Sequence, residues 1–189
     1  MECKYFGKCG ACVVYEGGYE TQLDIKVQIN KERFTPFYSK EISVFRSEDS
    51  HYRLRSEFKL WHDGDELYYA MNHIDKKGVV CIDECPQVSK HIFKLMPKLI
   101  EAVKTKGIDF KVFGADFLSS SDGEIVVSLI YHRKLDEEWQ LKAKEIAEEL
   151  GIYIIGRSRK QKVVIGQDFI TEKLTINAQT YFFKHIENS

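Results

Sequence analysis

Long apolar runs are missing from this chain of 189 residues. Its longest apolar stretches, such as IVVSLIY, are far shorter than the roughly 20 residues that a membrane-spanning helix needs. The opening residues, MECK, also lack the apolar segment of a secretory signal. These absences exclude a spanning helix and a secreted protein, and they predict a cytoplasmic location with no membrane partner.

An excess of charge of one sign is missing as well. The chain holds 28 basic and 29 acidic residues, for a net charge of −1. This balance excludes a globally basic nucleic-acid binder but leaves room for a local basic face. The motifs G-x-G-x-x-G, G-x-x-x-x-G-K-[ST] and G-x-S-x-G do not occur, so a Rossmann-type domain has no support.

The sequence does contain the material for a packed domain. Hydrophobic residues make up 43% of the chain, which is enough for a core in one domain with or without a small appendage. Their periodicity predicts an α+β fold with a mainly antiparallel sheet, hairpins and two to three packing helices. The predicted helices are 19–34, 88–107 (kinked or broken at Pro97) and 136–151, and the predicted strands lie within 51–72, 109–134, 152–165 and 180–186.

The five cysteines are Cys3, Cys9, Cys12, Cys81 and Cys85. Disulfides are rare in the cytosol, so clustered cysteines there more often bind metal or do redox work. The C-x5-C-x2-C spacing of the first three lets one loop wrap an ion or a cluster, and a fourth thiolate must come from elsewhere. Cys85, which a proline follows, is the better candidate, and Cys81 is next. An iron–sulfur cluster, a zinc ion and a site without metal all remain open.

One face of the hairpin at 51–72 carries a basic stripe with an aromatic residue beside it. The stripe, which we call the hairpin stripe, consists of Arg53, Arg55, Lys59 and Trp61. Positive charge tracks phosphates and an aromatic ring stacks on a splayed base, so this pattern indicates RNA binding. A solvated strand face on which Glu57 partly compensates the charge explains the same pattern.

A long part of the sequence resembles a known enzyme family. The segments FRSEDSHYRLRSEFKLWHDGDELYYAMN, VVSLIYHRKLDEEW, IIGRSRKQKVVIGQDFI and IENS are similar to the N-terminal half of bacterial tRNA uracil-5-methyltransferases, which methylate the T-loop uridine. The resemblance covers about residues 19–189. It implies a cysteine-rich, cluster-binding segment at 1–18 and an RNA-binding α+β domain at 19–189, with the T-arm of tRNA as partner.

The cysteine segment resembles a sister branch that methylates ribosomal RNA. The C-x5-C-x2-C motif with a later Cys-Pro is similar to the 4Fe–4S motif of that branch. The resemblance implies a 4Fe–4S cluster held by Cys3, Cys9, Cys12 and Cys85, with zinc or an empty site as alternatives. The familiar tRNA enzymes lack these cysteines. The longer match favours tRNA as substrate, and rRNA is the alternative.

The part of the family that performs the chemistry is not found in these 189 residues. Family members continue with a methyltransferase domain that holds S-adenosylmethionine and a catalytic cysteine, whereas no cysteine follows Cys85 here. We therefore expect no catalytic residue and no S-adenosylmethionine site in this chain, and no methylation by it alone. The rival functions are a metal-stabilised RNA-binding remnant and a small iron–sulfur electron carrier; the hairpin stripe argues against the carrier.

The resemblance also assigns RNA contacts. Lys59 replaces an arginine that contacts the T-loop, while Phe113 and His132 match an aromatic residue and a histidine that insert among the loop bases. An ordinary core phenylalanine and an ordinary surface histidine are the alternatives for these two. Arg157 and Lys160 lie in a basic turn that we rank as a secondary phosphate contact.

Overall fold

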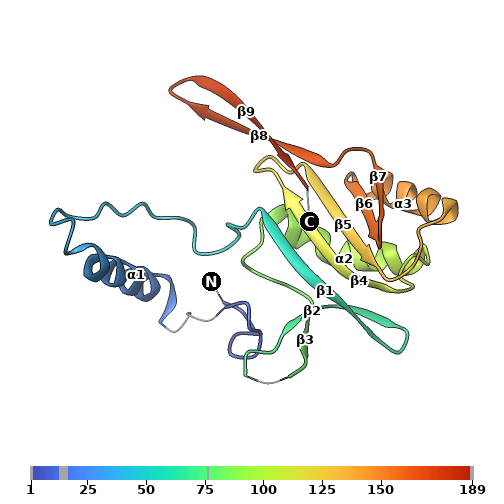
Figure 1. Ribbon diagram of the computed structural model, residues 1–189, viewed down its shortest axis with the longest axis horizontal. Coiled ribbons are helices and arrows are strands. Elements are labelled where there is room, and N and C mark those ends of the chain that lie inside the picture. The colour runs from blue at the N-terminus through green and yellow to red at the C-terminus, as the bar shows by residue number, and fades with distance from the viewer. Residues whose placement is uncertain (1, 13–16, 76, 188–189) are drawn as a thin grey trace.

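The computed structural model describes residues 2–12, 17–75 and 77–187 (Figure 1). One seven-stranded sheet has the order β3-β2-β1-β4-β5-β6-β7. Its strands are β1 (Arg55–Asp63), β2 (Glu66–Asn72), β3 (Val79–Ile82), β4 (Val112–Ser119), β5 (Ile125–Tyr131), β6 (Tyr153–Ser158) and β7 (Gln161–Ile165). A separate two-stranded ribbon consists of β8 (Phe169–Ile176) and β9 (Gln179–Ile186). The predicted α+β class and the three predicted hairpins are thereby confirmed.

The core lies between one face of the sheet and two helices, α2 (Lys90–Thr105) and α3 (Glu137–Leu150) (Figure 1). Neighbouring strands are antiparallel except β5 and β6, which α3 connects as a parallel crossover. Phe58 and Leu60 of β1 face this core, as the alternation in the sequence predicts. The other face of the sheet is left open by α2 and α3.

The signals that begin and end α3 are local ones. The carboxylate of Asp136 accepts a hydrogen bond from the amide of Trp139 at 2.9 Å and caps the first turn. Gly151 ends the helix in a left-handed conformation with φ 65°. Trp139 is buried edge-on against Tyr131, with the ring centroids 5.7 Å apart. The cap therefore fixes the residue through which α3 packs on the sheet.

The predicted helix around Pro97 continues without a break. α2 runs through Pro97, and the side chain of Ser89 caps its start by accepting a hydrogen bond from the amide of Ile92. A proline inside a helix removes one hydrogen bond. The buried face of α2, which includes Ile92, Met96 and Leu99, holds the helix together across that gap.

The first helix, α1 (Gly18–Phe34), lies away from the sheet (Figure 1). The described residues of α1 include none that is buried, although the sequence predicts an apolar face through Leu23, Val27 and Phe34. That face lines a surface groove together with residues 38–45. None of the helices in the described part of the chain has the length and apolar character to cross a membrane.

Candidate functional site

A bulge in β4 turns Phe113 away from the core. The register between β4 and β5 shifts between Val112 and Gly114, so Phe113 is the extra residue of a β-bulge. Its side chain is 36% exposed, whereas Phe117 of the same strand is 0% exposed. The alternative of an ordinary core phenylalanine therefore does not describe Phe113.

His132 lies immediately after β5 and meets Phe113. The two rings are stacked, with centroids 3.8 Å apart and an angle of 10° between their planes. The backbone amide of His132 donates a hydrogen bond to the carbonyl of Lys111 at 2.9 Å, which fixes the end of β5 against the start of β4. The pair presents a flat aromatic surface at the edge of the core, and such a surface can stack on a base.

Cationic side chains surround this stacked pair. The two rings line a hollow of about 580 Å³, a volume in the range of small-molecule and nucleotide sites. Of the described residues that line it, none is acidic, although the chain as a whole is nearly neutral. We call this site the cationic hollow; its charged members are Arg133, Lys134, Arg157 and Arg159.

Side-chain hydrogen bonds hold the loops of the cationic hollow in place. The hydroxyl of Ser158 donates to the carbonyl of Arg133 at 2.5 Å. The amide of Gln161 bonds to both backbone groups of Leu135, at 2.9 and 2.6 Å. Within the described chain, the Nε groups of Arg133 and Arg157 are buried without a hydrogen-bond partner. The guanidinium of Arg157 is held in place by its Nη2, which donates a hydrogen bond to the carbonyl of Glu187 at 3.0 Å.

The register of the sheet places Lys59 in line with the cationic hollow. Lys59 pairs with Gly114, Gly114 with Ile130, and Ile130 with Arg157. Directly paired residues point to the same face, and here it is the open face. Lys59 donates a hydrogen bond to the side-chain oxygen of Asn72 at 2.5 Å. A row of residues on four neighbouring strands therefore joins the hairpin stripe to the hollow.

The other predicted RNA contacts lie outside the hollow. Arg55 and Trp61 are exposed on the open face, and Arg53 is exposed just before β1. Arg55 lies 3.4 Å from Glu57 and 3.7 Å from buried Glu187. Lys160 occupies the turn between β6 and β7 with φ 60°. Arg159 belongs to the basic turn that we rank from the sequence as a secondary phosphate contact, whereas Arg133 and Lys134 were not singled out as site residues. For these two, the run HRK directly after a strand was the available signal.

A second site forms where the N-terminal segment meets the far edge of the sheet. The hydroxyl of Tyr5 donates to the carboxylate of Asp83 at 2.7 Å, and Lys4 lies 2.7 Å from the same carboxylate. The amide of Gly10 donates to the carbonyl of Asn72 at 2.8 Å. A Cβ added to Gly10 would lie 3.2 Å from that carbonyl, so the close approach favours glycine.

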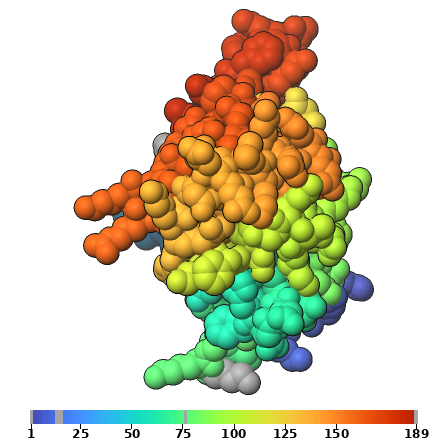
Figure 2. Space-filling view, turned by 90° about the vertical axis from the view of Figure 1, so that its right-hand side faces the viewer, coloured from blue at the N-terminus to red at the C-terminus, as the bar shows by residue number. Residues whose placement is uncertain are grey.

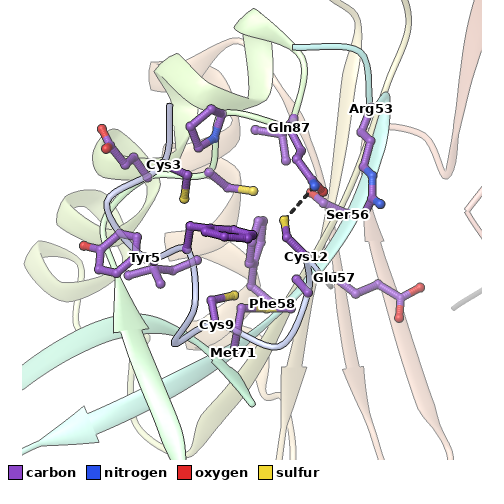
Figure 3. A pocket seen from close by; sticks show the side chains of 17 residues that line it. Cys3, Tyr5, Cys9, Cys12, Arg53, Ser56, Glu57, Phe58, Met71 and Gln87 are labelled. Carbon is purple, nitrogen blue, oxygen red and sulfur yellow. Dashed lines mark hydrogen bonds between the residues drawn. The ribbon is translucent and has the colours of Figure 1, made fainter. Parts of the chain in front are cut away.

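Four of the five cysteines line one small pocket in this region, which we call the cysteine pocket. Its members are Cys3, Cys9, Cys12 and Cys85, and its volume is about 70 Å³. Figure 3 shows Cys3, Cys9 and Cys12 around the pocket, with the side chain of Gln87 donating to the sulfur of Cys12 at 2.7 Å. Cys81 lies outside the pocket on β3, where it is exposed.

The thiols of the cysteine pocket influence one another. Burial raises the pKa of the Cys12 thiol, and the other three thiols add to the rise. Burial likewise raises the pKa of Cys85. Thiolates packed together in this way are stabilised by a bound cation or cluster. No group of three or more His, Cys, Asp or Glu side chains in the described ranges converges to hold a single metal ion.

Comparisons with known proteins agree on one family. The family model of tRNA (Uracil-5-)-methyltransferase matches residues 18–189. The match therefore begins after the segment that carries Cys3, Cys9 and Cys12. A tRNA/tmRNA (uracil-C(5))-methyltransferase of Sulfurimonas denitrificans is 64% identical over all of this chain and 52% of its own length. The enzyme of the same description from Vibrio parahaemolyticus is 42% identical over 90% of this chain and 48% of its own length.

A solved structure has the same fold. It is the tRNA (uracil-54, C5)-methyltransferase of Pyrococcus abyssi in complex with S-adenosyl-L-homocysteine, with a TM-score of 0.57 and 19% identity over 87% of this chain and 43% of that one. This chain spans about half the length of the curated relatives it matches. It belongs to the tRNA (uracil-5-)-methyltransferase family and corresponds to the N-terminal half of its members.

Proposed function

We propose that this chain is the RNA-recognition half of an S-adenosylmethionine-dependent tRNA 5-methyluridine methyltransferase of the cytoplasm. In this proposal the cationic hollow binds the T-arm of tRNA. The observation that carries it is the exposed stack of Phe113 on His132 inside a hollow whose charged members are all cationic. An RNA loop offers both partners that such a site needs, unstacked bases and phosphates.

The hollow divides the recognition between two kinds of contact. The aromatic pair offers its outer faces to bases, whereas Arg133 and Arg159 present donors to phosphate oxygens. Arg157, whose Nη2 donates to the carbonyl of Glu187, adds positive charge. Lys59, in line with the hollow across the sheet, extends the positive charge along the open face. Lys59 carries its charge as a point rather than as the planar fork of an arginine, so it supports phosphate contact more than bidentate recognition.

We assign the chemistry of methyl transfer to the half of the family's proteins that lies beyond these residues. Uridine methylation at C5 needs a nucleophile and a bound methyl donor. Four of the five thiols lie in the cysteine pocket, and Cys81 lies on β3, away from the cationic hollow. The proposal therefore gives this chain the role of binding and orienting RNA.

Charge removal in the hollow tests RNA binding. We expect Lys134→Gln with Arg159→Gln to weaken the binding of a T-arm hairpin, measured by fluorescence anisotropy, and to reduce the salt slope by about two. The matched control is Lys142→Gln with Lys144→Gln, which removes the same charge from α3 on the opposite face. Equal losses in both variants would refute a specific site in the hollow. Tighter binding of an rRNA hairpin than of the T-arm would refute the tRNA assignment.

We also propose a 4Fe–4S cluster as the cofactor of the cysteine pocket. Four thiols share the pocket, which is the donor set that such a cluster takes. A zinc ion, which four thiolates also bind, and a site without metal are the alternatives. When bound, the cluster would supply cross-links from Cys3, Cys9 and Cys12 to Cys85, and so hold the N-terminal segment on the sheet.

Metal analysis after anaerobic purification tests the cluster. We expect iron and sulfide in the purified protein, their loss in Cys85→Ser, and their retention in the matched variant Cys81→Ser. Visible absorption provides a second readout. Stoichiometric zinc, or full iron in Cys85→Ser, would overturn the assignment. Because the cluster and the hollow use different residues, either proposal can fail without the other.

A further inference from the structure

The ribbon of β8 and β9 has one apolar and one polar face. Residues that pair across the ribbon share a face, so Leu174 and Tyr181 lie together, as do Glu172 and Phe183. The apolar tip consists of Leu174, Ile176, Tyr181 and Phe183, all of them exposed. The opposite face carries Thr171, Lys173, Thr175, Thr180 and Lys184, together with the apolar residues Phe169, Phe182 and Ile186.

The two ends of the apolar face differ in their surroundings. At the base, Ile170 is buried against Leu118, Val126 and Ile155 on the open face of the sheet. The carboxylate of Glu172 there accepts a hydrogen bond from the amide of Ser121 at 2.8 Å. Toward the tip the same face projects beyond the body, which Figure 2 shows in red above the rest of the molecule.

A projecting ribbon of this kind is poorly stabilised alone. Two strands without a third strand or a helix against them are marginal in water. Four large apolar side chains on one face add the cost of exposed apolar surface. The opposite face carries well-solvated lysine and threonine side chains, and its exposed apolar members are Phe182 and Ile186. The larger apolar group, Leu174, Ile176, Tyr181 and Phe183, therefore makes the first face the better candidate for a partner.

We propose that the apolar tip of the ribbon docks against the C-terminal half of the full-length protein. The relatives are about twice as long as this chain, which corresponds to their N-terminal half. The ribbon is the last element before that second half, because β9 ends at Ile186. β9 leads from the tip back to the base, so the chain continues from the base of the ribbon, and the apolar tip extends outward from that point. The inference rests on family membership and not on RNA binding.

Hydrogen–deuterium exchange without RNA tests the docking. In the full-length protein we expect amides of 172–183 to exchange at least about tenfold more slowly than in the 189-residue chain. Phe183→Ser, and Tyr181→Ser as a second variant on the same face, should return this exchange to the rate of the shorter chain. The matched control is Phe182→Ser on the opposite face, where the replaced ring is 67% exposed, against 45% for Phe183. In this variant the amides of 172–183 should keep their slow exchange in the full-length protein.

Each alternative occupant gives a different result. Exchange at α2 in the core confirms that the variants are folded. Equal exchange in both proteins, or equal effects of the Phe182 and Phe183 variants, would overturn the proposal. Protection that depends on protein concentration would assign the tip to a second copy of the chain, and protection that requires tRNA would assign it to RNA. Either of these two results would also overturn the proposed docking against the C-terminal half.

Discussion

Replacement of Phe113 by alanine separates RNA binding from core packing. The ring is 36% exposed on a bulge and contacts His132 rather than the interior. Its truncation therefore leaves no closed cavity, unlike truncation of a core phenylalanine, which costs about 3–5 kcal/mol. Loss of a stacking aromatic costs about 1–3 kcal/mol per base, which corresponds to a rise in Kd of roughly 5- to 150-fold.

The matched control for this prediction is Phe117→Ala, on the same strand with a 0% exposed ring. Anisotropy with a T-arm hairpin measures the dissociation constant, and urea denaturation measures the free energy of unfolding. We expect Phe113→Ala to change mainly the dissociation constant and Phe117→Ala to change mainly the free energy of unfolding. If Phe113→Ala lowers the free energy of unfolding by as much as Phe117→Ala, or leaves Kd unchanged, the assignment of Phe113 to RNA is wrong.

Three further predictions concern stability. Gly156→Ala places a Cβ 2.3 Å from the ring of Trp139 and should lower the free energy of unfolding in urea by about 1–3 kcal/mol. Asp136→Ala removes the α3 cap and should cost about 1 kcal/mol in the same assay, whereas Asp136→Asn should cost less. Lys4 lowers the pKa of the Asp83 carboxyl, so this contact contributes stability above the ordinary pKa range of an aspartate and loses it as pH falls through the lowered pKa. The protection factors of amides 2–12, which correct for the slower intrinsic exchange in acid, should therefore fall in acid.

The elements whose pattern is local were predictable from the sequence. The alternation around Phe58 and Leu60 specified the first hairpin, and both residues are buried. The acidic start and the terminal Gly151 specified α3. β8 was not predicted, although Leu174 and Ile176 alternate with Lys173 and Thr175, and its outer half is exposed on both faces. The continuity of α2 through Pro97 depends on tertiary packing that a local rule does not contain.

The cationic hollow was only partly predictable, because its members come from distant segments. The crossover through α3 brings Arg157 of β6 beside Ile130 of β5. The bulge at Phe113 is a property of the pairing between β4 and β5, so no residue pattern within β4 alone reveals it. The family resemblance supplied Phe113 and His132, and the structure shows that the two rings lie in contact.

The choice between Cys81 and Cys85 has a simple physical basis in the fold. Ile82 of β3 is buried in the core, so Cys81, its neighbour on the strand, points to the opposite face. Cys85 lies beyond the end of β3, so its side chain does not have to follow the alternation of a strand. It lines the pocket together with the cysteines of the N-terminal segment. The sequence did not reveal this distinction, because VVCI is a continuous apolar run and residues 79–82 were not predicted as a strand.

The cysteine pocket is joined to the hairpin stripe through backbone pairing at the start of the first hairpin. The amide of His51 donates to the carbonyl of Pro86 at 2.7 Å, and that of Arg53 donates to the carbonyl of Gln87 at 2.9 Å. Residues directly after Cys85 therefore hold the beginning of the hairpin stripe. The cationic hollow, by contrast, is built from β4, β5, β6 and the loops that follow them. Order in the cysteine pocket should thus act on RNA through Arg53, while the stack of Phe113 on His132 stays intact without it.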